Sequence, residues 1–160
     1  MKALAGKIAV VTGANRGIGH AIALALAEAG ADIVGTSRQM SDDESIAKEV
    51  RALGQKFFPF ACDMKNRAES TALAKKVLTE VGQVDILVNN AGIGIHNSFI
   101  GTTEAEFDQL TNIQFKGPFF LTQKGLNVMN DGGGIVNIST GLARFSFPGY
   151  AAYASMKGAI

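Results

Sequence analysis

A glycine-rich turn between an apolar run and a periodic alanine-rich segment constrains this chain more than any other feature. The turn spans Thr12–Gly19, with the sequence TGANRGIG, and it follows the strand-like run Ile8–Thr12. Apolar residues at helical spacing follow it over Gly17–Ala29. Glycines let a backbone approach a ligand closely, and the first N–H groups of a helix point unpaired donors at an anion. The pattern therefore predicts a phosphate-binding turn, with a glycine-rich helix cap as the alternative.

Length and composition are those of an ordinary globular protein, and they exclude several classes of function. The 160 residues fit a single domain with one apolar core, and 47% hydrophobic with 18% charged residues is typical of such domains. A net charge of +1 gives no electrostatic basis for a nucleic-acid or membrane partner. No apolar stretch has the length of a membrane span, so we expect a cytoplasmic protein.

The few cysteine and histidine residues argue against disulfides and metals. Cys62 is the single cysteine and cannot form an internal disulfide, and its place at the end of an apolar run predicts a buried thiol. His20 and His96 lie far apart and lack the spacing of metal ligands, so we expect no metal site.

Strand-like and helix-like segments alternate along the whole chain. Strands are predicted at Ile8–Thr12, Asp32–Thr36, Lys56–Ala61, Asp85–Val88 and Gly134–Ser139, and helices at Gly17–Ala29, Asp42–Leu53, Asn66–Val81, Glu104–Met129 and Ala151–Ile160. Such alternation predicts an α/β fold, a Rossmann-like doubly wound parallel sheet with strand order 3-2-1-4-5 and helices on both faces. Within the longest helix, Gly117-Pro118 predicts a kink, because proline removes a hydrogen-bond donor.

In such a sheet a ligand lies beyond the carboxyl ends of the strands, near the switch point between strands 1 and 4. The second strand leads into Ser37 and Arg38, where the adenosine ribose of a dinucleotide would lie. A carboxylate there would bind a 2′-hydroxyl and repel a 2′-phosphate, but this chain offers a hydroxyl and a cation. Arg16 in the glycine turn could add a second guanidinium. These residues favour NADP(H) over NAD(H), and solvated surface arginines are the alternative.

The third and fourth strands end in residues that suit the other walls of a cofactor cleft. Asp63 could accept a hydrogen bond from an adenine amino group or could cap the next helix. Asn89–Gly92 combines amide donors and acceptors with a glycine that admits a close ligand. The same residue types are common in turns that bind nothing.

Tyr153 and Lys157 stand four residues apart in the last helical pattern and therefore share one face. A free phenol is a poor acid–base group at neutral pH, because its ordinary pKa is about 10. A neighbouring ammonium, with a cationic nicotinamide ring close by, favours the phenolate, so the pair suits general acid–base catalysis. Tyr150 stands seven residues from Lys157, too far along the helix for the same direct coupling.

Three motifs together resemble those of the short-chain dehydrogenase/reductase family. They are the Thr12–Gly19 turn, Asn89–Gly92, and Tyr153 with Lys157, in this order and spacing. The resemblance covers the whole chain. Among the members of the family, the chain resembles those that are similar to 3-oxoacyl reductases and prefer NADP. It implies an oxidoreductase that interconverts a carbonyl and a secondary alcohol of a small-molecule substrate by hydride transfer with NADP(H). By the same resemblance Tyr153 would be the general acid/base, and Lys157 would bind the nicotinamide ribose and favour the ionised tyrosine.

The resemblance also assigns a cofactor-binding set. In this sequence it comprises Gly13, Asn15, Arg16, Gly17, Ile18, Gly19, Ser37, Arg38, Asp63, Met64, Asn90, Ala91, Gly92, Tyr153 and Lys157.

Two catalytic positions depart from the family pattern. The family's catalytic hydroxyl stands thirteen residues before the tyrosine, which is Thr140, but Ser139 is its neighbour. Neighbours at a strand end point in opposite directions, so we expect one of the two to reach the substrate and favour Thr140. Where many members carry an asparagine in the long helix, this chain has Gln114, whose longer amide could still hold a water. Asn112 lies roughly 200° around the helix from it and is a poor substitute.

The end of the chain is the largest departure from the family. Ile160 follows Lys157 by three residues, whereas family members continue well beyond this motif. We therefore expect residues 1–160 to form a single dinucleotide-binding domain without the usual C-terminal substrate-loop portion. For the full-length protein we expect a homo-oligomer, a dimer or a tetramer. The alternative function is a catalytically weak or inactive fragment that binds a dinucleotide, and the alternative substrate class is a sugar or sugar acid.

Overall fold

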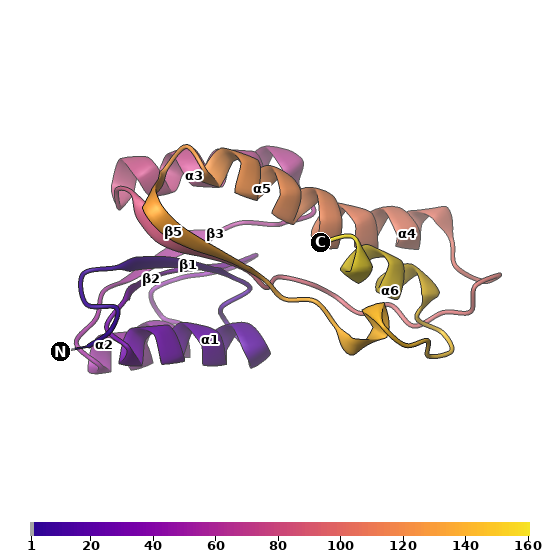
Figure 1. Cartoon of the computed structure of the whole chain (residues 1–160), viewed down its shortest axis with the longest axis horizontal. Helices are drawn as coiled ribbons and strands as arrows, with labels where there is room; N and C mark the ends of the chain where they lie inside the picture. The colour runs from indigo at the N-terminus through magenta and orange to yellow at the C-terminus, as the bar shows by residue number, and fades with distance from the viewer. Residues whose placement is uncertain (1) are drawn as a thin grey trace.

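Five parallel strands form the central sheet of the computed structural model, which describes residues 2–160 (Figure 1). The strands are β1 (Ile8–Thr12), β2 (Asp32–Ser37), β3 (Phe57–Ala61), β4 (Val84–Asn89) and β5 (Met129–Asn137). Their order is β3-β2-β1-β4-β5, and every neighbouring pair is parallel. The predicted doubly wound sheet and its strand order are therefore confirmed.

Helices cover both faces of the sheet, and Figure 1 shows the two layers. One face carries α1 (Gly17–Glu28) and α2 (Ser45–Ala52), and the other carries α3 (Arg67–Glu80) and α5 (Gly117–Gly125). Beyond one end of the sheet, α4 (Glu104–Thr111) packs against α6 (Ala151–Gly158). Within residues 2–160, no helix combines the length and the apolar character that crossing a membrane requires.

Successive residues of β1 belong to two different apolar cores. Val11 shares one core with Ala23 and Ala27 of α1, and these alanines let the helix lie close to the sheet. Val10 shares the other core with Leu73 of α3. Because both faces of the strand are buried, β1 is an unbroken apolar run. A strand with one solvent-exposed face would instead alternate apolar and polar residues. This run is what made the strand predictable beside the glycine turn.

The single helix predicted over Glu104–Met129 is divided in the structure. α4 passes into a π turn at Asn112–Lys116, and α5 follows from Gly117. The Gly117 N–H donates to the Asn112 carbonyl five residues back, and Pro118 has no N–H to donate. The interruption lies beside Gly117-Pro118, where the sequence predicts it, and it takes the form of a π turn.

The predicted junction between this helix and the last strand is wrong, because α5 ends four residues before Met129 and β5 begins at Met129. Met129 pairs with Val84 and Gly134 pairs with Ile86, so five steps along β5 match two along β4. Three consecutive glycines occupy the irregular part of β5, and glycine carries no strand signal. The other helices and strands begin and end within three residues of their predicted limits.

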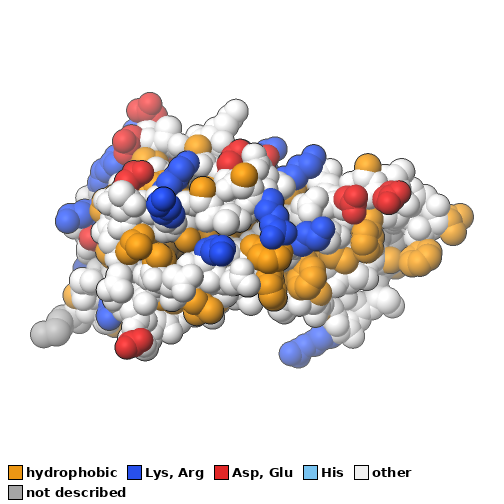
Figure 2. Space-filling view, turned by 90° about the horizontal axis from the view of Figure 1, so that it is seen from above, with side chains coloured by type: hydrophobic (Ala, Val, Ile, Leu, Met, Phe, Trp, Pro, Cys, Tyr) orange, Lys and Arg blue, Asp and Glu red, His pale blue; other side chains and the backbone are white. Residues whose placement is uncertain are grey.

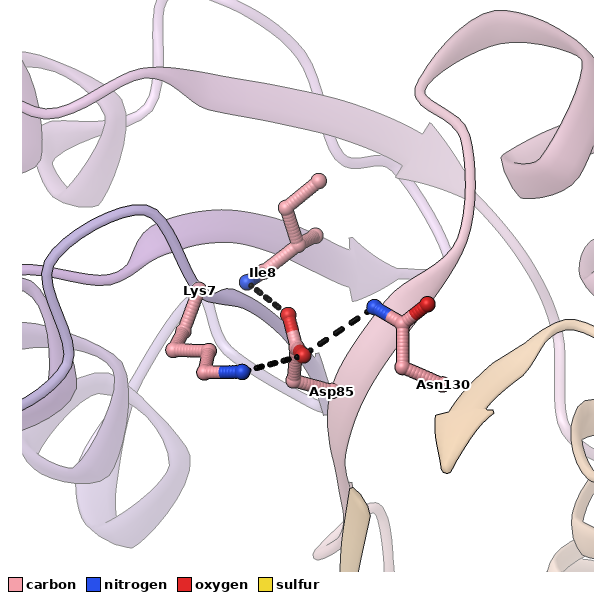
Figure 3. Close-up of polar contacts among 4 residues, drawn as sticks. All are labelled: Lys7, Ile8, Asp85 and Asn130. Carbon is pink, nitrogen blue, oxygen red and sulfur yellow. Dashed lines mark hydrogen bonds and ion pairs between the residues drawn. The ribbon is translucent and has the colours of Figure 1, made fainter. Parts of the chain in front are cut away.

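Asp85 near the start of β4 links the amino ends of three strands (Figure 3). Its carboxylate accepts hydrogen bonds from the Ile8 N–H at 2.9 Å, from Lys7 Nζ at 2.9 Å and from Asn130 Nδ2 at 3.0 Å. Burial by itself acts to raise the pKa of this carboxyl, which is 7% exposed. The donors outweigh burial, so the Asp85 pKa lies below its ordinary value.

Replacing Asp85 with asparagine should lower the free energy of unfolding at neutral pH by about 1–3 kcal/mol, because buried donors lose a charged acceptor. The folded pKa of Asp85 is lowered, so its contribution is present above the ordinary value of 3.8 and is lost as the pH falls through the folded value. Urea unfolding at several pH values measures both effects, with the exposed Asp43→Asn as the control. Equal stability of Asp85→Asn and the unchanged chain at neutral pH would contradict this role.

Candidate active site

A cleft lies beyond the carboxyl ends of the strands, where the fold class predicts a ligand. It is bordered by the glycine turn, by the segments that follow β2, β3, β4 and β5, by the π turn and by α6. Every predicted site residue except Thr140 lines it, namely Gly13, Asn15, Arg16, Gly17, Ile18, Gly19, Ser37, Arg38, Asp63, Met64, Asn90, Ala91, Gly92, Gln114, Ser139, Tyr153 and Lys157.

The Thr12 hydroxyl and the Asn90 amide join β1 to β4 beside the cleft. Thr12 Oγ1 accepts from the N–H of Asn90 at 2.9 Å and of Ala91 at 3.0 Å, and it donates to the Val88 carbonyl at 3.3 Å. Asn90 Nδ2 in turn donates to the Thr12 carbonyl at 2.9 Å. Thr12 is 1% exposed, so this corner is a buried hydrogen-bonded junction between two strands.

The N-terminus of α1 presents backbone donors that no side chain satisfies. Arg16 at the N-cap makes no capping hydrogen bond, and the first turn contains no acidic residue. A Cβ on Gly19 would lie 2.2 Å from the Gly13 carbonyl oxygen and 2.4 Å from Asn90 Nδ2, so only glycine fits there. Gly17 has φ +59° and faces open space. A bare, positively polarised helix end of this kind fits the pyrophosphate of a dinucleotide.

Hydroxyl groups and cations gather where β2 ends. Thr36 Oγ1 and Ser37 Oγ are buried and have no hydrogen-bond partner among residues 2–160. Arg16 and Arg38 are exposed, line the same cleft and make no ion pair within that described part of the chain. The carboxylates that line the cleft are Glu44, seven residues after β2, and Asp63 and Glu69, which follow β3. The cleft therefore offers an anion two guanidinium groups, one from the glycine turn and one that follows β2.

Asp63 and Met64 follow β3, and Asp63 does not cap the next helix. Asn66 caps α3, since its side chain accepts from the Ala68 N–H at 3.0 Å. Asp63 Oδ1 instead accepts from the Lys65 N–H at 2.9 Å, within a tight turn. The capping alternative for Asp63 is thereby removed, and its contact with an adenine ring stays a prediction.

Cys62 is buried, as predicted, and burial raises the pKa of its thiol to about 11, with Glu69 and Asp63 adding to the shift. Such a thiol stays protonated at neutral pH and is a poor nucleophile. Within residues 2–160, no group of three His, Cys, Asp or Glu side chains is arranged to hold a metal ion.

Lys157 is held at two points by the residues that follow β5. Its Nζ donates to the Ile138 carbonyl at 2.7 Å, and its own carbonyl accepts from Ser139 Oγ at 2.6 Å. The residue is 5% exposed, and this burial lowers the pKa of its ammonium below the ordinary value. Tyr153 lies one turn earlier on α6 and also lines the cleft. The structure thus places the predicted pair on a helix beside the end of β5.

The two candidate hydroxyls after β5 differ in their hydrogen bonds. Ser139 lines the cleft, but its one proton is donated to the Lys157 carbonyl. Thr140 is not among the residues that line the cleft, and its hydroxyl accepts from the Leu142 N–H at 3.4 Å. The Thr140 proton is donated to no atom of residues 2–160. As the predicted catalytic hydroxyl, Ser139 is favoured by its position in the cleft, whereas Thr140 is favoured by its free hydroxyl proton.

Gln114 lies in the π turn and is fully buried. Its Nε2 donates to the Ile93 carbonyl at 2.8 Å, whereas its Oε1 has no partner among residues 2–160. A Cβ built on Gly92 would lie 3.2 Å from Gln114 Oε1 and 3.6 Å from Lys157 Nζ. The amide oxygen and the ammonium therefore lie on either side of the same small space next to Gly92. A buried acceptor without a partner marks a place for a water or a ligand group.

Sequence reasoning missed the contacts that depend on backbone carbonyls and on one buried amide. Ile138 and Ile93 offer only carbonyl oxygens to Lys157 and Gln114, and a carbonyl leaves no mark in a sequence. Asn89 is 2% exposed, and its Nδ2 donates to one side chain of α5 and to one of β5. A polar residue at the end of an apolar strand was the signal that could have identified Asn89 as a structural amide.

A parallel doubly wound sheet, with an uncapped helix N-terminus and a tyrosine–lysine pair in one cleft at the ends of its strands, defines a fold of the Rossmann class. The short chain dehydrogenase family matches residues 7–160 of the chain. The chain therefore belongs to the short-chain dehydrogenase/reductase family, as its three motifs predict.

Relatives and solved structures resemble the chain over nearly all of its length. Short chain dehydrogenase/reductase nsrJ of Aspergillus novofumigatus is 35% identical, over 98% of this chain and 60% of the relative. A 2-dehydro-3-deoxy-D-gluconate 5-dehydrogenase of Dickeya dadantii is 36% identical, over 98% of this chain and 62% of the relative. A blue fluorescent protein from a metagenomic library was solved in complex with NADPH. It is 35% identical with a TM-score of 0.92, and the match covers 98% of this chain and 65% of that protein. The chain thus spans 60 to 65% of the length of these proteins.

Replacing Gly19 with alanine should weaken NADPH binding by at least about tenfold, because the added Cβ overlaps the Gly13 carbonyl and pushes α1 away from the turn. Gly94→Ala is the matched control, since Gly94 lines the same cleft and a Cβ there meets nothing within 4 Å. Titration followed by cofactor fluorescence measures both affinities. Unchanged affinity in Gly19→Ala would show that this turn does not hold the cofactor.

Proposed function

We propose that this chain carries the cofactor-binding and catalytic residues of an NADP(H)-dependent oxidoreductase that interconverts a carbonyl and a secondary alcohol. One observation carries the proposal: Tyr153 and Lys157 share a cleft with the uncapped N-terminus of α1. The pair supplies acid–base chemistry, and the helix end supplies donors to phosphate. A nicotinamide dinucleotide, when bound, supplies or accepts the hydride.

The cleft suits the phosphorylated cofactor better than NAD(H). The glycine turn would hold the pyrophosphate, and Arg16, Arg38 and the unpartnered Ser37 hydroxyl would hold a 2′-phosphate. No carboxylate at the end of β2 opposes that phosphate. Two similar solved structures are complexes with NADPH and with NADP, which supports the same choice. The Asn90–Gly92 segment would line the nicotinamide end.

Proton transfer falls to Tyr153. Its hydroxyl would donate to the carbonyl oxygen during reduction and would take a proton from the alcohol during oxidation. Lys157 lies one turn later on α6, and its buried ammonium favours the ionised tyrosine. Because burial lowers the pKa of Lys157, its ammonium gives up a proton more readily than an exposed lysine and can resupply Tyr153.

Thr140 and Gln114 complete the proposed proton chemistry. Thr140 has a free hydroxyl proton for the substrate oxygen, whereas Ser139 uses its proton to hold the Lys157 carbonyl. Its free proton favours Thr140 as the hydroxyl that contacts the substrate, and Ser139, which lines the cleft, is the alternative. Gln114 Oε1 borders the same point as Lys157 Nζ, where a water would connect Lys157 to further proton donors.

For the substrate we propose a small ketone or its alcohol. A 3-oxoacyl thioester is one class, and a sugar acid is the alternative, supported by the named 2-dehydro-3-deoxy-D-gluconate 5-dehydrogenases among the relatives. A panel that contains both classes of carbonyl, read by loss of NADPH absorbance, separates them.

Exposed apolar side chains support self-association of the full-length protein, which we also propose. Phe107 of α4 is 43% exposed, Phe119 of α5 is 54% exposed, and Phe99 and Ile100 before α4 are exposed almost entirely. Figure 2 shows apolar side chains gathered toward the end of the molecule that carries α4. Large exposed apolar groups of this kind mark protein interfaces. The single unpaired thiol of Cys62 suits the cytoplasmic location that we propose.

Replacing Tyr153 with phenylalanine should lower kcat by about a hundredfold to ten-thousandfold, because the phenol that transfers the proton is lost. The Kd for NADPH should stay within about twofold, since the ring remains on α6. NADPH absorbance over the carbonyl panel measures turnover, and cofactor fluorescence measures binding.

Tyr150→Phe is the control, because it removes the other phenol of the chain. Undiminished turnover in Tyr153→Phe would remove Tyr153 from its role. Cofactor binding without turnover by the unchanged chain, over the whole panel, would favour the alternative of a binding fragment.

Replacing Arg38 with aspartate should shift cofactor preference from NADPH toward NADH, because a carboxylate repels a 2′-phosphate and accepts a 2′-hydroxyl. The ratio of the two Kd values, measured by cofactor fluorescence, should change by at least about tenfold. Lys124→Asp makes the same change of charge at an exposed position outside the cleft and should leave the ratio unaltered. A ratio that stays constant in Arg38→Asp would refute the cofactor assignment.

A further inference from the structure

Three rings form a continuous chain that ends at Tyr153. His96 and Tyr150 have ring centroids 5.0 Å apart at an interplanar angle of 70°, and Tyr150 and Tyr153 have centroids 6.0 Å apart at 71°. Phe147 adds a tilted contact with Tyr150 at 6.1 Å. Edge-to-face ring pairs at these separations attract each other and favour one relative orientation. Tyr150 is therefore the centre of an aromatic cluster that includes the proposed acid–base residue.

Gly149 allows the imidazole of His96 to reach Tyr150. A Cβ on Gly149 would lie 2.2 Å from His96 Nε2 and 2.6 Å from His96 Cδ2, and Gly149 also has φ +85°. The Asn97 N–H donates to the Gly149 carbonyl at 2.9 Å. The loop that carries His96 therefore packs directly on the turn that precedes α6.

The same loop is tied to the start of α4. Asn97 Nδ2 donates to Glu106 Oε2 at 3.1 Å and to the Gly101 carbonyl at 3.0 Å. Glu106 also accepts from the Thr103 N–H at 2.8 Å, which completes a capping box on α4. The hydrogen bond from the Thr103 N–H and that from Asn97 hold the pKa of Glu106 below its ordinary value. His96 thus approaches Tyr150 from an anchored support.

Tyr153 is half-buried on α6 and lines the cleft. Its hydroxyl makes no hydrogen bond with any atom of residues 2–160, which leaves it to a substrate. Tyr150 is at the N-cap of α6, three residues before Tyr153, so the two side chains lie on adjacent turns of one face. The Tyr150 ring is therefore in a position to set the direction in which the Tyr153 phenol points.

We propose that Tyr150 is a positioning residue that holds the Tyr153 ring in its cleft-facing orientation, with His96 as the support behind it. The inference rests on the proposed role of Tyr153 as the acid–base residue. The role requires the ring of Tyr150 and not its hydroxyl, because the ring makes the contacts with His96 and Tyr153. A proton donor displaced by about 1 Å can lose roughly a hundredfold in rate, so a fixed ring has catalytic value.

The composition of the chain makes this proposal testable without turnover. The chain has two tyrosines and no tryptophan, so any replacement of Tyr150 leaves Tyr153 as the only tyrosine. Tyr150→Phe keeps a ring at this position, and Tyr150→Leu removes it. In protein with carbon-13-labelled tyrosine, the ring resonances then report the surroundings and the flipping rate of Tyr153 directly.

We expect Tyr150→Phe to keep the ring-current shift of Tyr153 and a kcat within about twofold of the unchanged chain. Tyr150→Leu should remove that shift, speed up the ring flips and lower kcat by at least about tenfold, with the Kd for NADPH unaltered. In the Tyr150→Phe background, where Tyr153 is the only tyrosine, His96→Leu should change the Tyr153 resonances in the same direction, and His96→Phe should restore them, because the support needs a ring and not a charge.

Identical Tyr153 resonances in Tyr150→Leu and Tyr150→Phe would overturn the proposal. Should Tyr150→Leu fail to fold, His96→Leu in the Tyr150→Phe background carries the same test, and unaltered Tyr153 resonances there would overturn the proposal equally. The resonances need neither substrate nor turnover. A lack of activity in the unchanged chain would therefore count against the proposed function and leave the positioning role to be decided by the spectra.

Discussion

The hydrogen bonds of the Thr12 hydroxyl are the constraint on which the rest of the cleft depends. One buried oxygen accepts from the N–H groups of Asn90 and Ala91 and donates to the Val88 carbonyl, which uses all of its hydrogen-bonding capacity. These bonds fix β1 against β4 at the point where the strand order reverses. The connections leave toward opposite faces there, so no helix covers the strand ends, and a cleft remains.

The same junction explains why α1 begins where it does. Asn90 Nδ2 occupies space that a Cβ on Gly19 would need, so the helix can start this close to β4 only with glycine at that position. Farther along α1, Ala23 and Ala27 keep the helix close to the sheet. Small residues therefore act twice on one helix. They pack it tightly against the core, and they leave its first N–H groups bare and facing the cleft, where a phosphate can satisfy them.

Sequence periodicity predicted the strands and their order because buried parallel strands are unbroken apolar runs bounded by turn residues. It failed at β5, which has three consecutive glycines in its middle and whose alignment depends on the hydrogen bond from Asn130 to Asp85. The π turn around Gln114 was also hidden, because its helical pattern continues on both sides. Motifs predicted most of the residues that were proposed for the site and that the structure places along the cleft. The choice between Ser139 and Thr140 could not be predicted, because it depends on which hydroxyl proton α6 already uses.

The position of Lys157 follows from β4, although β4 and α6 are far apart in the sequence. β5 is largely exposed and adds little to the core, so its alignment depends on hydrogen bonds to β4. At the cleft end the buried amide of Asn89 donates to Asn137, and the Asn89 carbonyl accepts from the Ile138 N–H at 2.9 Å. The Ile138 carbonyl then holds Lys157 Nζ. Thr12 fixes β4, β4 fixes the end of β5, and the end of β5 fixes the Lys157 amine, so buried polar contacts position the lysine of the proposed acid–base pair.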